Sequence, residues 1–226
     1  DYCHPCQVLA DLMTIREFKG SIKGHKLCYI GDGNNMAHSL IVGGIKMGMS
    51  VSIGCPESHK PDAEIMEWAS KNGDFTCTSD IFEAAKDADV LYIDVWASMG
   101  QESEAERRKK IFAGYQINDD LMAVAKPDAM VLHCLPAHRE EEITAKVFEE
   151  HAKEIFEGIC NKYLSVNEQG DLNLGGICLV AGLGPENNLR RDGTYEYYMS
   201  EPIVENDAKG VGPFIMAYTE VKRLNK

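Results

Sequence analysis

The chain has 226 residues, of which 44% are hydrophobic, and it carries 23 basic and 36 acidic side chains. This length and hydrophobic content suffice for one large or two small globular domains. The acidic excess argues against general binding of nucleic acid or anionic membranes, and no apolar run approaches the roughly 20 residues that cross a bilayer. We therefore expect small molecules or proteins as partners.

The apolar pattern predicts a helix first and then a regular alternation of strands and helices. A helix is expected from Pro5 to about Phe18, with one face formed by Val8, Leu9, Leu12, Met13 and Ile15. Short apolar strands are then expected at 26–32, 50–55, 75–78, 90–96 and 130–135, and helices at 36–48, 62–72, 80–88 and 119–126. This alternation predicts an α/β fold with a doubly wound, Rossmann-like parallel sheet.

The apolar periodicity and the composition of the sequence change beyond about Glu157. Period-two runs around a Glu-Gln-Gly-Asp turn predict a β-hairpin. The following stretch, 181–207, is rich in Gly, Asn and Tyr without clear periodicity and is expected to form a long loop. A terminal helix is expected over 210–224. We therefore expect a first domain over 1–157 and a different segment over 158–226.

Ligands of doubly wound sheets gather at the carboxyl ends of the strands, which selects three stretches of this chain. The first, "GDGNN" at 31–35, begins like a dinucleotide fingerprint, but Met36 stands where the third glycine belongs and Cys55 replaces the acidic residue of the next strand. NAD binding is therefore disfavoured. Asn34 and Asn35 could bind a polar ligand or simply cap a helix.

The second stretch, "DVWASMGQE", places Asp94 at the end of a hydrophobic strand. A carboxylate there is costly to desolvate without a cationic partner, so it either meets a ligand ammonium group or caps the next segment. In the third, "HCLPAHR", the side chains of His133 and Cys134 are expected on opposite faces of a strand, which disfavours a shared metal ion. Cys134 is then either a ligand contact or an ordinary buried thiol.

Eight cysteines are scattered through apolar segments and do not form a small disulfide scaffold, which favours a reducing, cytoplasmic setting. Cys3-His-Pro-Cys6 has the C-x-x-C form of a thiol oxidoreductase or of half a zinc site. No βαβ unit leads into this motif, as a thiol oxidoreductase would require. No second pair of cysteine or histidine ligands follows at the spacing of a zinc finger, so we expect no metal there.

Four stretches together resemble the second domain of ornithine carbamoyltransferases, within the aspartate and ornithine transcarbamylase family: "DYCHPCQVLADLMTI", "GDGNNMAHSL", "DVWASMGQE" and "HCLPAHREEEIT". The resemblance implies an amino-acid-binding domain over 1–157 and an enzyme of arginine metabolism that makes citrulline and phosphate from L-ornithine and carbamoyl phosphate. It also implies a homotrimer without cofactor or catalytic metal.

The same resemblance assigns site residues by motif. It implies that carbamoyl phosphate is bound by His4, Gln7 and Cys134. It implies that ornithine is bound by Asn35, Asp94, Ser98, Met99 and Leu135, and that Asp94 and Cys134 are catalytic. The sequence departs from the family in two places: it contains no Ser-Thr-Arg-Thr segment, and "EIFE" continues into "GICNKYL" where the family has Glu-Asn-Arg. We therefore expect an incomplete form of the enzyme.

The last part has a separate resemblance. "LSVNEQGDLNLGGICLVAGLG" and "RDGTYEYYMSEPIVENDAKGVGPFIMAYTEV" resemble the carboxyl end of unsaturated rhamnogalacturonyl hydrolases, which are α/α barrels that act on pectin fragments. This implies a partial barrel over 158–226 and leaves two alternatives open for the chain: a carbohydrate-processing protein, or a ligand-binding module fused to an unrelated segment. The catalytic aspartate of that family lies upstream of this piece, so the resemblance assigns no catalytic residue here.

Overall fold

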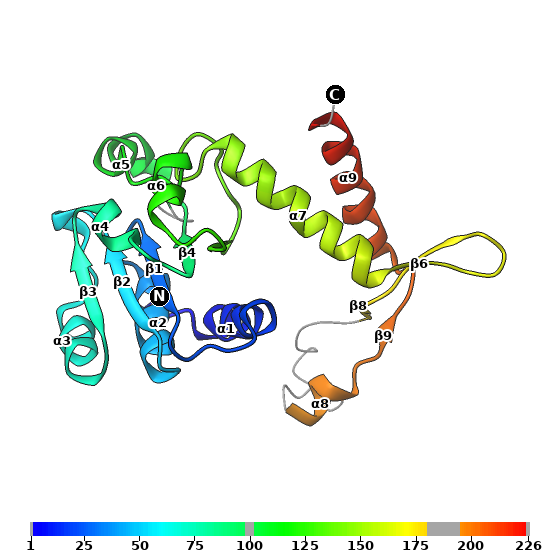
Figure 1. Ribbon diagram of the computed structural model, residues 1–226, viewed down its shortest axis with the longest axis horizontal. Helices are drawn as coiled ribbons and strands as arrows, with labels where there is room; N and C mark the ends of the chain where they lie inside the picture. The colour runs from blue at the N-terminus through cyan, green and yellow to red at the C-terminus, as the bar shows by residue number, and fades with distance from the viewer. Residues whose placement is uncertain (1, 98–101, 180–194, 225–226) are drawn as a thin grey trace. The chain divides into compact units, whose positions relative to one another are not determined.

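The computed structural model describes residues 2–97, 102–179 and 195–224. The chain divides into two compact units, Asp1–Phe148 (unit 1) and Glu149–Lys226 (unit 2) (Figure 1). None of the helices in the described ranges is long and apolar enough to cross a membrane.

Unit 1 is built on one five-stranded sheet. Its strands are β1 (Lys26–Ile30), β2 (Ser50–Gly54), β3 (Phe75–Thr78), β4 (Val90–Ile93) and β5 (Met130–His133). All pairs are parallel and the order is β3-β2-β1-β4-β5, which confirms the predicted doubly wound sheet. Its helices are α1 (Pro5–Lys19), α2 (Asn35–Lys46), α3 (Ala63–Asn72), α4 (Ile81–Ala85), α5 (Ala105–Phe112), α6 (Asp119–Val124) and the start of α7 (Ala145–Tyr163). The periodicity does not predict α5 or α7.

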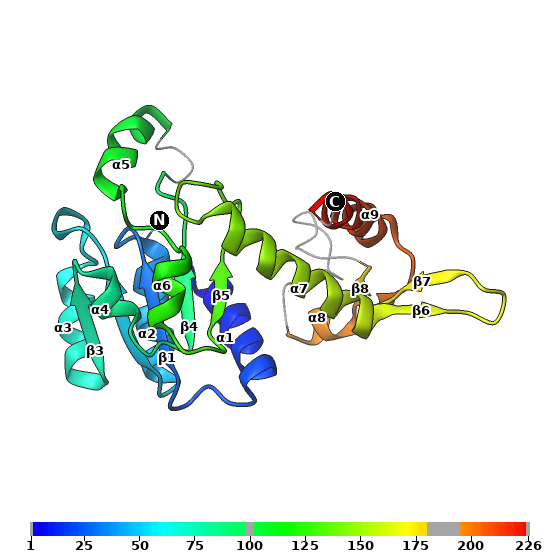
Figure 2. The same cartoon turned by 45° about the horizontal axis from the view of Figure 1, so that its top comes forward.

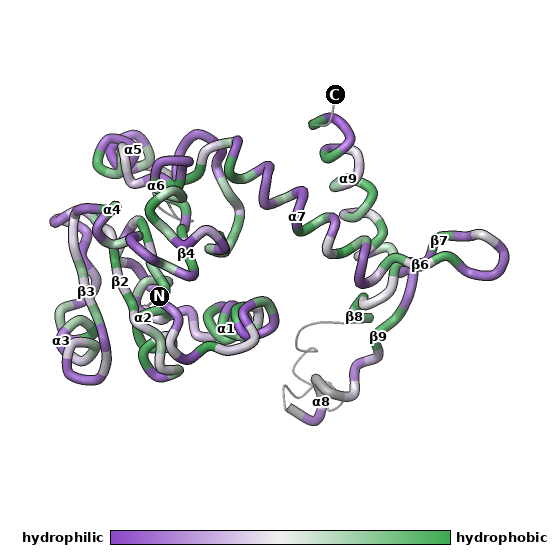
Figure 3. The backbone as a smooth tube through the Cα atoms, in the orientation of Figure 1, coloured by the Kyte–Doolittle hydropathy of each residue, from purple (hydrophilic) through white to green (hydrophobic). Residues whose placement is uncertain are grey.

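Helices cover both faces of the sheet (Figure 2). One face packs against α1, α2 and α3 in a cluster that includes Ile15, Leu40 and Ala69. The other packs against α4, α6 and the first turn of α7, through residues such as Ala84 and Val147. The central strands β1 and β2 are correspondingly hydrophobic in Figure 3, as a parallel sheet covered on both sides requires.

The inner face of α1 is narrower than its sequence predicts. Val8, Leu12 and Ile15 are buried, but Leu9 and Met13 are 62% and 55% exposed, so their assignment to the core-facing stripe is wrong. The helices α1 and α2 pack closely because Gly43 of α2 has no side chain. A Cβ at this position would lie 2.7 Å from Val8 Cγ1.

Unit 2 contains the rest of α7 and two small antiparallel pairs. They are β6 (Leu164–Val166) with β7 (Leu172–Leu174), and β8 (Ile177–Cys178) with β9 (Ile203–Val204). The described part of the unit also contains α8 (Tyr195–Ser200) and α9 (Ala208–Leu224). The predicted hairpin and terminal helix are confirmed. The expected long loop is wrong in part, because α8 and β9 both lie within 181–207.

Hydrogen bonds of one asparagine shape the hairpin turn of unit 2, and aromatic contacts pack its two long helices together. Asn167 Oδ1 accepts the backbone N–H groups of Gln169 (3.0 Å) and Asp171 (2.8 Å), which closes the turn. The ring of Phe156 on α7 stacks on Phe214 of α9 with centroids 5.1 Å apart, and Tyr218 lies 6.3 Å from it. These rings hold α7 against α9.

Candidate functional site

The sheet register brings the three selected stretches to the same place. Ile30, Ile93 and His133 end β1, β4 and β5 side by side, so the residues that follow them leave the sheet at one edge. Cys134 Sγ donates to Asp94 Oδ1 at 3.0 Å, and Asn34 Nδ2 donates to Asp94 Oδ2 at 3.0 Å. The polar groups that follow three strands therefore meet at the carboxylate of Asp94.

Asp94 is a buried carboxylate whose partners among the described residues are all neutral. The residue is 8% exposed, and its carboxylate also accepts the backbone N–H of Val95 at 2.7 Å. No ion pair of Asp94 occurs within the described ranges. Three neutral donors offset part of the cost of removing a carboxylate from water, and a cationic ligand group would offset more.

Cys134 is a protonated thiol in this environment. Burial raises the pKa of Cys134, and the charge of Asp94 and the hydrogen bond to it raise it further. A thiol of this kind is a poor nucleophile at neutral pH, because the thiolate is the reactive form. Its chemistry is to donate a weak hydrogen bond and to line the site.

His133 points away from Cys134. Its Nε2 lies 3.1 Å from Glu142 Oε1, while its Nδ1 accepts the backbone N–H of Leu135 at 2.8 Å. Because Nδ1 accepts this bond, Nε2 is the nitrogen that donates to Glu142. The two neighbouring side chains therefore reach different partners, as strand geometry predicts.

Of the two neighbouring asparagines, Asn34 is the helix cap. Its Oδ1 accepts the N–H groups of Met36 (3.0 Å) and Ala37 (3.2 Å), while its Nδ2 holds Asp94. Asn35, which the family resemblance assigns to ornithine, is half-buried and its Oδ1 accepts the N–H of Met36 at 3.1 Å. The predicted capping role is confirmed for Asn34, and the ligand role of Asn35 stays a prediction.

The start of α1 is tied to the sheet by a chain of hydrogen bonds. Gln7 Nε2 donates to Asp11 Oδ1 at 3.0 Å, and Tyr92 Oη donates to Asp11 Oδ2 at 3.0 Å, two residues before Asp94. Burial raises the pKa of Asp11, although these two bonds act in the opposite direction. The exposed His4 is anchored through its backbone N–H, which donates to Ser39 Oγ at 2.7 Å.

Of the remaining predicted residues, the structure describes Leu135. Leu135 is 61% exposed and has a left-handed backbone with φ of 55°, a conformation that non-glycine residues adopt rarely. Its side chain is therefore open to a ligand. Ser98 and Met99 lie outside the described residues.

Arg108 links two turns at the edge of the sheet, a role that the sequence did not predict. Its Nη2 pairs with Asp32, its Nε donates to the carbonyl of Trp96, and its guanidinium lies 5.0 Å from the ring centroid of Phe112. Arg108 thus joins the turn after β1 to the turn after β4. The signal available in the sequence was Asp32 itself, a carboxylate at a strand end that needs a cation.

Gly33 serves the same edge of the sheet through its size. A Cβ there would lie 2.2 Å from Pro61 N and 2.6 Å from His59 O, and the Gly33 N–H donates to that carbonyl at 2.8 Å. The glycine therefore allows contact between two backbone segments, which explains a G-x-G sequence without a dinucleotide.

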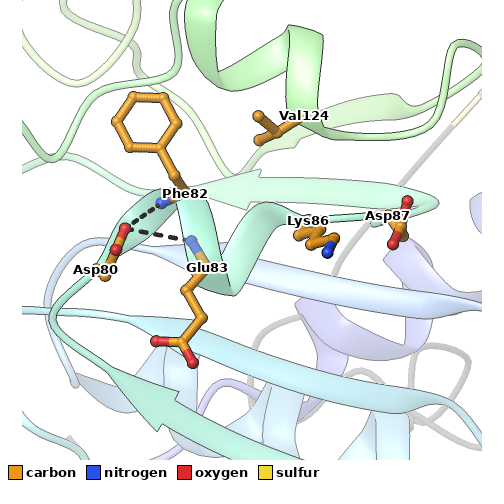
Figure 4. A pocket seen from close by; sticks show the side chains of 6 residues that line it. All are labelled: Asp80, Phe82, Glu83, Lys86, Asp87 and Val124. Atoms are coloured by element: carbon orange, nitrogen blue, oxygen red, sulfur yellow. Dashed lines mark hydrogen bonds between the residues drawn. The ribbon is translucent and has the colours of Figure 1, made fainter.

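Two other features include none of the residues that bond to Asp94. Ligand atoms of His138, Glu141 and Glu142 lie within 4.8 Å of one another, an arrangement that could hold a cation, but Glu141 already pairs with Lys109 at 2.8 Å. A shallow depression of about 500 Å³ lies beside α4 (Figure 4). There the Asp80 carboxylate accepts the N–H groups of Phe82 and Glu83 as a helix cap, and none of the lining residues is a predicted site residue.

Two protein families match this chain. The Asp/Orn binding domain of aspartate/ornithine carbamoyltransferases matches residues 23–167, and Glycosyl Hydrolase Family 88 matches residues 128–225. The ornithine carbamoyltransferase of Pyrococcus abyssi is 50% identical over 182 residues, which are 78% of this chain and 57% of that protein. The chain therefore spans little more than half the length of this relative.

Solved structures give the same result. The ornithine carbamoyltransferase from Pyrococcus furiosus is 56% identical with a TM-score of 0.62, over 66% of this chain and 49% of its own. The anabolic ornithine carbamoyltransferase from Campylobacter jejuni is 41% identical with a TM-score of 0.64, over 70% and 54%. Both resemblances expected from the sequence motifs are confirmed. The chain belongs to the aspartate/ornithine carbamoyltransferase family, of which it carries the Asp/Orn binding domain.

Proposed function

We propose that residues 1–157 form the ornithine-binding part of an ornithine carbamoyltransferase, which makes citrulline and phosphate from L-ornithine and carbamoyl phosphate. The observation that carries the proposal is Asp94, a buried carboxylate with three neutral donors at the carboxyl edge of the sheet. The α-ammonium group of ornithine is the cation that would complete its surroundings. The relatives at about half sequence identity support the choice of ornithine.

The proposal gives the other predicted residues the roles that the family motifs imply. Asn35, Ser98, Met99 and Leu135 hold the rest of ornithine, and His4 and Gln7 face the carbamoyl group. Cys134, which remains a neutral thiol, lines the point where the δ-amine attacks and donates to Asp94. Carbamoyl transfer also requires positive donors for the developing oxyanion and the departing phosphate. Those groups come from the Ser-Thr-Arg-Thr and Glu-Asn-Arg segments of the family, which this sequence does not contain.

The proposal makes two measurable statements about the purified chain. L-ornithine protects unit 1 against proteolysis and raises its unfolding temperature, whereas putrescine, which is ornithine without its α-carboxylate, does not. The chain by itself forms no citrulline from ornithine and carbamoyl phosphate. Measurable citrulline turnover by the 226-residue protein would refute the second statement, and equal protection by putrescine would refute the first.

The family match over 128–225 favours a second candidate for the last segment. We propose that residues 158–226 are a fragment of an α/α barrel of the carbohydrate-processing type. Exposed apolar side chains on α9, including Ile215 and Met216, fit a fragment whose neighbouring hairpins would cover them. We expect no release of sugar from an unsaturated pectin disaccharide, and detectable release would show that the segment is active. The intact family member is proposed to be a homotrimer in the cytoplasm. The eight cysteines of this chain, none of which forms a disulfide, fit a reducing compartment.

A further inference from the structure

Two cysteines that the proposed function does not use lie in contact at the edge of the sheet. Cys55 follows β2 and Cys77 is in β3, and their Sγ atoms are 3.7 Å apart. The register pairs Gly54 with Thr78, and the Cys55 N–H donates to the Thr78 carbonyl at 3.0 Å. The two thiols are therefore held side by side by the backbone pairing of two neighbouring strands.

The two thiols differ in access. Cys55 is fully buried, whereas Cys77 is half-buried on β3, which is an edge strand of the sheet. A dissolved oxidant can therefore reach Cys77 first. Cys55 stands behind it, in position to attack whatever forms on the Cys77 sulfur.

The electrostatic surroundings make Cys77 the more reactive of the two. The hydrogen bond between the two thiols lowers the pKa of Cys77, and burial acts in the opposite direction; the charge of Lys60 assists the lowering, and that of Glu57 opposes it. Reactivity of a cysteine toward peroxide follows its thiolate fraction and its access to solvent. By contrast, burial raises the pKa of Cys28 to about 12, so this thiol on β1 is inert.

We propose that Cys55 and Cys77 are a reversible oxidation site, at which hydrogen peroxide converts the two thiols into a disulfide bond between β3 and the end of β2. The Cys77 thiolate attacks one peroxide oxygen and becomes a sulfenic acid, with release of hydroxide. The Cys55 thiol then attacks the Cys77 sulfur, and the sulfenic oxygen leaves as water. The sum is two thiols and one hydrogen peroxide giving one disulfide and two waters.

The geometry requires a small rearrangement. A disulfide bond is about 2.05 Å long, so the two sulfur atoms must approach by about 1.7 Å. Cys55 is followed by Pro56 and, four residues after Cys55, by His59. The His59 carbonyl accepts the Gly33 N–H, so a movement of Cys55 is passed to the turn that contains Gly33. Oxidation is thus placed beside the turn that carries Asn34. The proposal does not depend on which ligand that turn binds.

The test uses the full folded chain and a mass readout. Trypsin is expected to leave Cys55 alone in peptide 47–71 and Cys77 alone in peptide 72–86. After treatment with hydrogen peroxide and alkylation of the remaining thiols, we expect a species with the summed mass of these peptides less two hydrogen atoms. Dithiothreitol should remove it. Absence of this species from the wild-type chain, or preferential pairing of either cysteine with another partner, would overturn the proposal.

Variants test the order of events. In Cys55→Ser, the sulfenic acid persists on Cys77, and dimedone labels peptide 72–86. In Cys77→Ser, peptide 47–71 remains a free thiol. The matched control Cys28→Ser keeps the linked species at the wild-type level. Labelling of Cys55 in Cys77→Ser, to the extent seen for Cys77 in Cys55→Ser, would contradict the assignment of Cys77 as the reactive thiol. Tryptophan fluorescence verifies that each variant is folded.

Discussion

Replacement of Arg108 by Met is expected to destabilise unit 1 strongly. The side chains of Arg108 and Asp32 are 6% and 14% exposed, so the substitution leaves a largely buried carboxylate without its cation. Loss of one partner of a buried ion pair costs about 3–5 kcal/mol, and the carbonyl of Trp96 also loses a donor. Because Asp32 retains some solvent access, we place the loss near the lower limit, about 3 kcal/mol.

Urea unfolding followed by tryptophan fluorescence measures this loss directly. The only two tryptophans, Trp68 and Trp96, both belong to unit 1, so the signal reports on that unit. The matched control is Lys109→Met, because Lys109 is 44% exposed and its pair with Glu141 is expected to contribute about 0–1 kcal/mol.

A second substitution separates the ion pair from simple loss of packing. Adding Asp32→Asn to Arg108→Met removes the stranded charge and is expected to recover part of the lost unfolding free energy. The reasoning fails if Arg108→Met costs no more than Lys109→Met, or if the double variant is as unstable as the sum of the two single variants.

Three further predictions concern other parts of the chain. Gly33→Ala places a Cβ against the backbone of Pro61 and should cost about 3 kcal/mol in thermal unfolding, whereas Gly158→Ala, with open space around it, should not destabilise. Burial raises the pKa of Asp89, but hydrogen bonds from Lys126, Lys26 and His25 outweigh burial, so the pKa is lowered in the folded state. The ionised Asp89 carboxylate therefore stabilises the fold above about pH 4, and this stabilisation is lost as the pH falls through the folded-state pKa. The difference in unfolding free energy between wild type and Asp89→Asn should shrink over that range; a constant difference would contradict this. Phe156→Ala should cost about 2 kcal/mol and speed hydrogen exchange in α9, and the exposed Ile155→Ala should change it little.

The strand–helix alternation was predictable because each strand of a covered parallel sheet is a short apolar run, as in "KLCYI" and "VLYI". The rule that ligands gather at strand carboxyl ends also selected Asp94 and Cys134 before their contact was visible. Periodicity could not rank Leu9 and Met13 against Leu12, because apolar residues surround much of α1.

Contacts between distant residues set the limit of prediction. Arg108 and Asp32 are 76 residues apart, and nothing in the local pattern of α5 indicates that one of its arginines turns inward. The same holds for Tyr92 and Asp11, which are 81 residues apart. The sequence does not distinguish the two asparagines after Gly33. The direction in which α2 begins decides that Asn34 both caps the helix and donates to Asp94.

Calorimetric titration with L-ornithine and with 5-aminopentanoate tests the central claim most directly. The second compound is ornithine without its α-ammonium group, the group assigned to Asp94. We predict that the folded chain binds ornithine, that 5-aminopentanoate binds at least about tenfold more weakly, a loss of about 1.4 kcal/mol, and that Asp94→Asn removes this preference while remaining folded by its urea transition. Equal binding of both compounds by the wild-type chain, or an unchanged preference in Asp94→Asn, would contradict the account.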